Sequence, residues 1–194
     1  GIFTLLYNTT GLRNTATGNY GLVSNDSGGD NAAYGYQALT NNTRGSQNVA
    51  MGPNTLLYNK GNNGSTAIGY QAMMNPDTSE FFPEQRTTYN TAIGYESLKG
   101  NYPPWNNTGT DNTATGAHTL KNNSAGSSNV AIGSRALFTN TTGNTNIAIG
   151  RSALYSNTDK SNLMAIGDSA LFYNTTGNMN LAFGASALKS NVSG

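Results

Sequence analysis

The chain contains no cysteine, only one histidine and one tryptophan among its 194 residues, and few charges. The missing cysteines exclude a disulfide scaffold, a thiolate zinc site and a cysteine nucleophile. Charged residues make up 10 % of the chain and the net charge is +1, so nothing attracts nucleic acid or an anionic membrane over long range. The sequence has no run of 18 apolar residues, and we expect no membrane insertion of this segment.

Residue groups that catalyse reactions are also scarce. We find no serine–histidine–aspartate arrangement, no carboxylate pair and no phosphate-binding loop, since the glycines follow a repeat. We therefore expect no enzyme activity, no cofactor and no metal. His118 has no second histidine or acidic cluster at ligand spacing, so we expect it on the surface. No leader sequence opens the chain, and any export signal is expected outside this segment.

Small polar residues are abundant instead. Asparagine (30), threonine (25), glycine (24) and serine (17) supply 96 of 194 positions, a composition that often indicates disorder. An internal repeat argues against disorder here. A phrase of the form Asn-x-Ala-x-Gly recurs ten times, and seven of the nine intervals between its alanines are identical in length. The repeated alanines are Ala16, Ala33, Ala50, Ala67, Ala92, Ala114, Ala131, Ala148, Ala165 and Ala182.

Other positions repeat with these alanines. A glycine follows each alanine by two residues, and leucine or methionine follows by six. Asparagine precedes the alanine by two residues in eight copies, with Ser65 and Leu163 as the departures. Around the alanine, small residues alternate with β-branched, aromatic or other apolar ones, which is the period of a β-strand. Because glycine, asparagine and turn segments are poor helix formers, the pattern excludes helical repeats.

The 17-residue unit predicts one coil of a parallel β-solenoid. We expect a strand at the alanine, a second short strand from the Ala-Leu pair (as in Ala136-Leu137), and turns at Asn-Thr-Thr-Gly. Coils spaced by about 4.8 Å would form a rod roughly 50 Å long. The whole chain, residues 1–194, is then one all-β repeat domain of about ten coils, with small-residue ladders in a narrow interior.

The two long intervals are interpreted as loop insertions at one place in the unit, over about 74–89 and 100–111. Insertions in repeat arrays tend to lie on one face, which often binds partners. Their aromatic residues can stack on sugar rings or anchor a partner, although folding back onto a coil is an equal alternative. These candidate contact residues are Phe81, Phe82, Tyr89, Tyr102 and Trp105.

The residues flanking the alanine form a second prediction. In a single solenoid one face of this strand would meet water and expose an apolar stripe that includes Ile132, Ile149, Ile166 and Phe183. We expect a further copy of the chain to cover it, most simply with threefold symmetry; a stripe only partly facing solvent is the alternative. The ends show no distinct capping repeat, so we also consider a filament built by stacking of ends.

The repeats resemble those of a known family. Asn129-Val-Ala-Ile-Gly133, Asn146-Ile-Ala-Ile-Gly150 and Ser65-Thr-Ala-Ile-Gly69 are similar to head repeats of YadA-type trimeric autotransporter adhesins. The longer Asn90-Thr-Ala-Ile-Gly-Tyr-Glu-Ser-Leu98 is similar to repeats of bacterial surface and phage tail-fibre-like proteins. The resemblance implies a left-handed β-roll, a homotrimer and an extracellular, cell-surface role in adhesion or fibre building. The unit of this chain is longer than the unit of that head family, and no stalk or anchor is present.

Three functions remain open from the sequence. The first is a non-enzymatic extracellular fibre or adhesin segment that contacts a host or surface glycan or protein. The second is a self-polymerising filament, and the third is a carbohydrate-binding module using the aromatic insertions. Nine Asn-x-Ser/Thr triplets cluster in turns where a glycan would be exposed, although turn chemistry explains the clustering. These candidate glycosylation sites are Asn8, Asn25, Asn41, Asn63, Asn106, Asn122, Asn140, Asn174 and Asn191.

Overall fold

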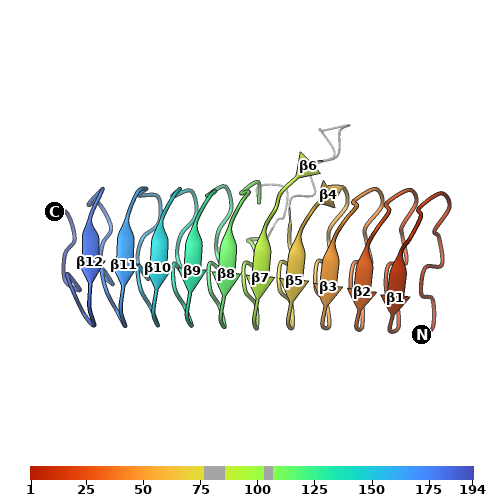
Figure 1. The fold of residues 1–194 in the computed structure, drawn as a ribbon, viewed down its shortest axis with the longest axis horizontal. Helices are drawn as coiled ribbons and strands as arrows, with labels where there is room; N and C mark the ends of the chain where they lie inside the picture. Colours follow the sequence, from red (N-terminus) through yellow and green to blue (C-terminus); the bar gives the residue numbers. More distant parts are fainter. Residues whose placement is uncertain (77–85, 103–106) are drawn as a thin grey trace.

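The computed structural model describes residues 1–76, 86–102 and 107–194, and it is a straight rod of stacked coils (Figure 1). Ten three-residue strands form one parallel sheet along the rod, and the described residues contain no helix. The predicted parallel β-solenoid is therefore confirmed, with nine turns between the ten strands. The strands are β1 (Thr15–Thr17), β2 (Ala32–Tyr34), β3 (Val49–Met51), β5 (Thr66–Ile68), β7 (Thr91–Ile93), β8 (Thr113–Thr115), β9 (Val130–Ile132), β10 (Ile147–Ile149), β11 (Met164–Ile166) and β12 (Leu181–Phe183).

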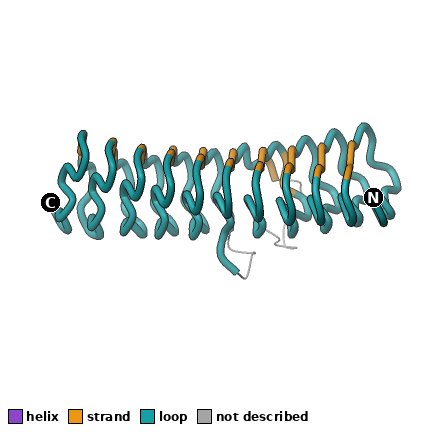
Figure 2. The backbone as a smooth tube through the Cα atoms, turned by 90° about the horizontal axis from the view of Figure 1, so that it is seen from below, coloured by secondary structure: helices purple, strands orange, loops and turns teal. Residues whose placement is uncertain are grey.

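The register follows the sequence repeat. Each strand pairs its central alanine with the alanine of the next coil, as Ala131 pairs with Ala148. From Ala33 to Ala182 these central alanines are at most 2 % exposed. Figure 2 shows the strands in one row along the rod, with turns and loops forming the rest of each coil. The alternation of side chains along a strand then places both neighbours of each alanine on the outside.

The expected second strand of each coil is wrong. The Ala-Leu segment instead contains residues in the left-handed region, such as Leu137 (φ 50°) and, two residues earlier, Arg135 (φ 59°). Alternating backbone handedness curls the chain too tightly for a strand, yet it still forms coil-to-coil hydrogen bonds. Leu137 N donates to Ala153 O at 3.0 Å. Because leucine rarely adopts this conformation, we attribute it to burial: Leu137 is 0 % exposed in the interior.

Asparagine side chains form two hydrogen-bonded ladders inside the rod. The strand-side ladder uses the residue two before each strand alanine, and the turn-side ladder uses the residue nine after it. In the turn-side ladder, Asn42 Nδ2 donates to Asn25 Oδ1 (2.8 Å) and to Gly45 O (2.9 Å). In the strand-side ladder, Asn48 N donates to Asn31 Oδ1 (3.0 Å). All four asparagines are at most 1 % exposed, so buried amides are satisfied by their own repeats.

A short extra sheet lies where the insertions leave the rod. It pairs β4 (Asn62–Asn63) with β6 (Arg86–Thr87) in parallel, and β6 stands apart from the main sheet in Figure 1. The bases of the two insertions contact each other here. Asn107 Nδ2 donates to Asn75 O at 2.6 Å, and Arg86 Nη2 donates to Thr108 O.

Candidate functional site

The strongest candidate site is the outer sheet face, which we define as the twenty residues that flank the central alanines of the ten strands. None of the twenty is charged. Most are β-branched or otherwise apolar, as in β9, β10 and β11. The regular spacing of the repeat brings them into two in-register columns because every coil repeats the same backbone path.

This face meets solvent. Ile93 and Ile132 are each 40 % exposed, and Phe183 is 79 % exposed, whereas Ile149 and Ile166 are half-buried by their neighbours. The predicted apolar stripe is thus present on the single chain, with its residues exposed to differing degrees. Surface stripes of this kind indicate an interaction site when they are contiguous.

The size of the face limits what it can bind. Nine strand intervals of about 4.8 Å and a width near 10 Å give roughly 400 Å². That matches the larger exposed patches of soluble proteins, but it is about half of what each partner contributes to a standard interface. A stable assembly therefore needs this face together with adjoining surface.

Charged residues lie outside the face and pair along the rod. Arg13 bonds Asp30 in the next coil (Nε–Oδ1, 2.5 Å), and Arg151 bonds Asp168 (Nη2–Oδ2, 3.0 Å). The hydrogen bonds from these arginines lower the pKa of Asp30 and of Asp168. Since both pairs are exposed, they contribute little stability.

A second feature is a nearly buried carboxylate on another side of the rod. Glu96, 7 % exposed, bonds Lys99 Nζ at 2.6 Å and Lys121 Nζ at 2.7 Å. His118 Nδ1 lies 3.2 Å from Glu96 Oε2. Burial opposes ionisation of Glu96, but the hydrogen bonds from Lys121 and Lys99 outweigh it and lower the pKa to about 2.

This cluster was not expected from the sequence, where His118 has no acidic cluster at ligand spacing. Its members lie in consecutive coils: His118 occupies the repeat position of Glu96 one coil later, and Lys121 occupies that of Lys99. Alignment of the coils into columns would have detected it. In this cluster Lys99, Lys121 and His118 all contact Glu96, so we interpret it as a clamp between adjacent coils beside the insertions.

Aromatic residues form a stacked column next to this clamp. Phe138, Tyr155 and Phe172 occupy one repeat position, with ring centroids 5.2 and 4.9 Å apart and planes within 3° of parallel. Lys121 and Lys189 occupy the same position in the coils beyond, each with Nζ 6.0 Å from the terminal ring. Ring faces used against each other and against ammonium groups are not free to stack on a sugar.

The structure describes two of the five predicted loop aromatics. Tyr102 is 80 % exposed and Tyr89 is 66 % exposed. Tyr89 sits directly before the strand-side ladder residue Asn90, in the same left-handed conformation (φ 49°) as its equivalents in other coils, so it belongs to the coil. Phe81, Phe82 and Trp105 lie outside the described residues.

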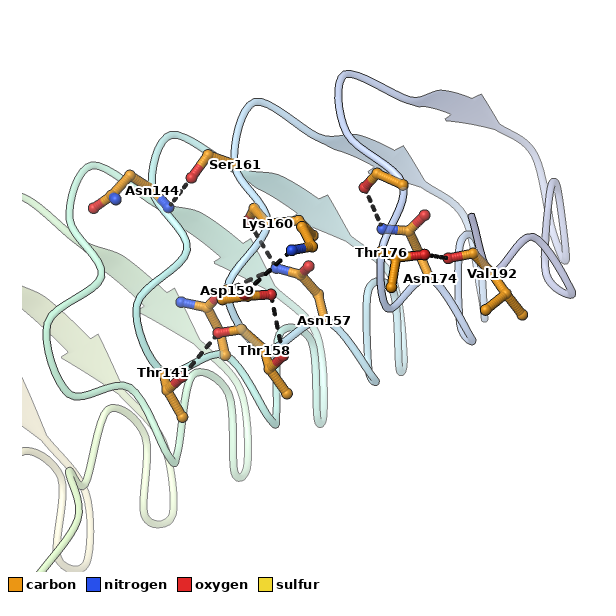
Figure 3. Close-up of polar contacts among 12 residues, drawn as sticks. Thr141, Asn144, Asn157, Thr158, Asp159, Lys160, Ser161, Asn174, Thr176 and Val192 are labelled. Atoms are coloured by element: carbon orange, nitrogen blue, oxygen red, sulfur yellow. Dashed lines mark hydrogen bonds and ion pairs between the residues drawn. The ribbon is translucent and has the colours of Figure 1, made fainter. Parts of the chain in front are cut away.

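The asparagine side chains of the turns are less exposed than we expected. Asn25, Asn140 and Asn174 are 0 % exposed turn-side ladder residues, so a folded chain offers no access to their Nδ2 atoms. The side chains of Asn157 and Asn174 are likewise buried in the turn-side ladder. Neighbouring threonines connect adjacent coils: Thr141 Oγ1 donates to Thr158 O at 2.9 Å (Figure 3). Asn8, Asn41, Asn63, Asn122 and Asn191 are half-buried, and Asn106 lies outside the described residues.

Among the residues that the structure describes, no three histidine, cysteine, aspartate or glutamate side chains gather as a metal site would require. In the same residues, no helix has the length and apolarity to span a membrane. Comparison with protein-family models, curated proteins and solved structures gave no match to this chain.

Proposed function

We propose that this chain is a non-enzymatic structural segment, a rigid rod of an extracellular fibre or adhesin that associates with copies of itself. The observation that carries the proposal is the outer sheet face: twenty in-register positions without a charge on a ten-stranded parallel sheet. Sheet faces that remain in water usually alternate with polar residues or carry charges. A long uncharged face therefore favours burial against another surface.

A second copy is the partner that fits best. The columns repeat with one spacing, so two rods laid side by side match at every coil, and no charge has to be desolvated. The roughly 400 Å² of one face is small for a two-rod interface. An assembly of three rods gives each chain two neighbours and buries adjoining surface as well, in line with the homotrimer that the sequence resemblance implies.

The extracellular, cell-surface location is also part of the proposal and rests on that resemblance. The rod would set a fixed spacing, and the insertions would contact a host or surface glycan or protein. The exposure of Tyr102 supports contact by the insertion region. The carbohydrate-binding alternative uses this same region, and the stacked aromatic column offers it no free ring faces.

The mass of the chain in solution tests self-association. We expect analytical ultracentrifugation to give three times the mass of the monomer. Ile132→Lys together with Ile149→Lys should reduce it to the monomer, because each lysine would be desolvated in the interface. Ser134→Lys, an exposed position in the coil of Ile132, is the matched control and should leave the mass unchanged.

Other masses measured by ultracentrifugation would contradict the proposal or favour an alternative. A wild-type monomer at all concentrations contradicts the proposal. Very large species that survive the paired isoleucine substitutions would indicate polymerisation by another surface. Loss of glycan-array binding in Tyr102→Ala, with the mass unchanged, would support the carbohydrate-binding alternative.

A further inference from the structure

Both asparagine ladders lose their asparagine in the same coil, that of β5. The strand-side ladder has Ser65 at this level, and the turn-side ladder has Pro76, one repeat unit after Asn59. Serine is too short to replace the asparagine amide, and proline has neither a side-chain amide nor a backbone N–H. One coil of the rod therefore contributes no asparagine to either ladder; we call each such missing residue a missing rung.

A polar cavity of about 30 Å³ lies at this level. The residues around it come from the interrupted coil and from the bases of both insertions. Its polar lining includes Asn62, Ser65, Asn75, Thr88, Asn107 and Asn123. A space of about 10–15 Å³ is enough for one water molecule, so the cavity is large enough for one or two.

An unsatisfied acceptor borders the cavity. Asn75 is 6 % exposed, and its Oδ1 has no hydrogen-bond partner among the described residues. On the N-terminal side, Asn59 Oδ1 is likewise buried without a partner there, whereas Asn42 Oδ1 in the coil before accepts from Asn59 Nδ2 at 2.7 Å. Asn59 Oδ1 lacks the donor that the next ladder residue would supply, and Asn75 Oδ1, which is not a ladder atom, is a second acceptor that needs a donor, because an unsatisfied buried polar group is destabilising.

We propose that this cavity is a binding site for structural water, which replaces the missing ladder rungs. Water fits because the site has both kinds of partner: Asn75 Oδ1 and the hydroxyl oxygens of Ser65 and Thr88 can accept, while the amide of Asn123, which uses one N–H on Gly126 O, can donate the other. Thr88 Oγ1 donates to Asn63 O at 3.3 Å, and the two hydroxyls share a hydrogen bond of 2.7 Å, so both hydroxyl protons are used and their oxygens keep the capacity to accept. The lining named above carries no carboxylate, which argues against a divalent cation.

The bound water would have a structural role. Two long insertions leave the rod at neighbouring coils. Each begins where the coil would otherwise supply its turn-side ladder residue. In the coil of β7, for example, Asn101 stands at the turn-side ladder position but donates to Asn122 O at 2.8 Å. Water at the gap lets the stack continue through this region without a buried group left unpaired.

A crystal structure of the whole chain at a resolution that shows ordered solvent tests the proposal. We expect a water hydrogen-bonded to Asn75 Oδ1. In Pro76→Asn the new amide should donate to Asn59 Oδ1, as Asn59 does to Asn42, and displace the water. Pro76→Ala, which removes the proline without adding an amide, should keep it. Relative to Pro76→Ala, Pro76→Asn should raise the urea midpoint of unfolding.

Three results would overturn the inference. The first is a wild-type structure without ordered density at Asn75 Oδ1. The second is an anomalous peak at the site in crystals soaked with thallium, which would identify a monovalent cation. The third is a Pro76→Asn structure that retains the water, or a urea midpoint no higher than that of Pro76→Ala.

Discussion

Replacing Gly150 with alanine is expected to destabilise the rod more than any exposed substitution, because the position is restricted twice. Its φ of +129° is one that residues with a side chain rarely adopt, a strain of about 1–3 kcal/mol. In addition, the new Cβ would lie 2.4 Å from Gly167 O of the next coil. The obstacle is backbone, so only separation of the coils relieves it.

A matched substitution isolates the second restriction. Gly52 has the same φ, +129°, but its added Cβ would meet Gly69 at 2.9 Å. An ordinary contact of a Cβ begins at 3.4 Å, so both added Cβ atoms would be too close to the next coil. The overlap at Gly150 is twice the overlap at Gly52. With overpacking at about 1–3 kcal/mol, we expect a loss of about 4 kcal/mol for Gly150→Ala and about 3 kcal/mol for Gly52→Ala. Gly61, with nothing within 4 Å of an added Cβ, should change by less than about 0.5 kcal/mol.

Urea unfolding gives the total loss, and hydrogen exchange shows which coils open, since stacked repeats can unfold separately. The substituted coil and its C-terminal neighbour should exchange fastest. Equal losses for Gly150→Ala and Gly52→Ala would show that backbone conformation alone matters. No loss in either would refute the close approach of adjacent coils at the glycine column.

Two further predictions concern polar groups. Glu96 has a pKa near 2 against an ordinary 4.5, so its ionised form adds about 3 kcal/mol of stability above pH 4.5, which is lost as the pH falls toward 2. Glu96→Gln should therefore unfold more easily at pH 7, and its deficit in urea should vanish near pH 2; a deficit independent of pH would contradict this. Asn42→Leu should cost about 3 kcal/mol by leaving ladder partners unpaired, while Asn178→Leu at an exposed position should cost little, as measured by thermal unfolding.

The sequence alone determined the periodic part of this protein. A repeat with fixed alanine, glycine and leucine positions allows few arrangements, because parallel in-register strands are the simplest way to stack identical short units. Register followed directly, since Ala131 can meet Ala148 only if every coil has the same path. The exposed apolar columns followed from the alternation of side chains about the alanine.

Only the tertiary structure decided the features that depend on side-chain direction or on contacts between coils. The Ala136-Leu137 pair resembles a strand by its apolar pattern, but packing in a narrow interior holds Leu137 in a left-handed conformation. Asn140 lies in a turn sequence, yet its amide points inward because the ladder and Gly143 O provide its partners. Aligned repeats bring Glu96 and Lys121 to adjacent coils, but only the structure shows that their side chains meet, with Lys121 Nζ 2.7 Å from Glu96 Oε2.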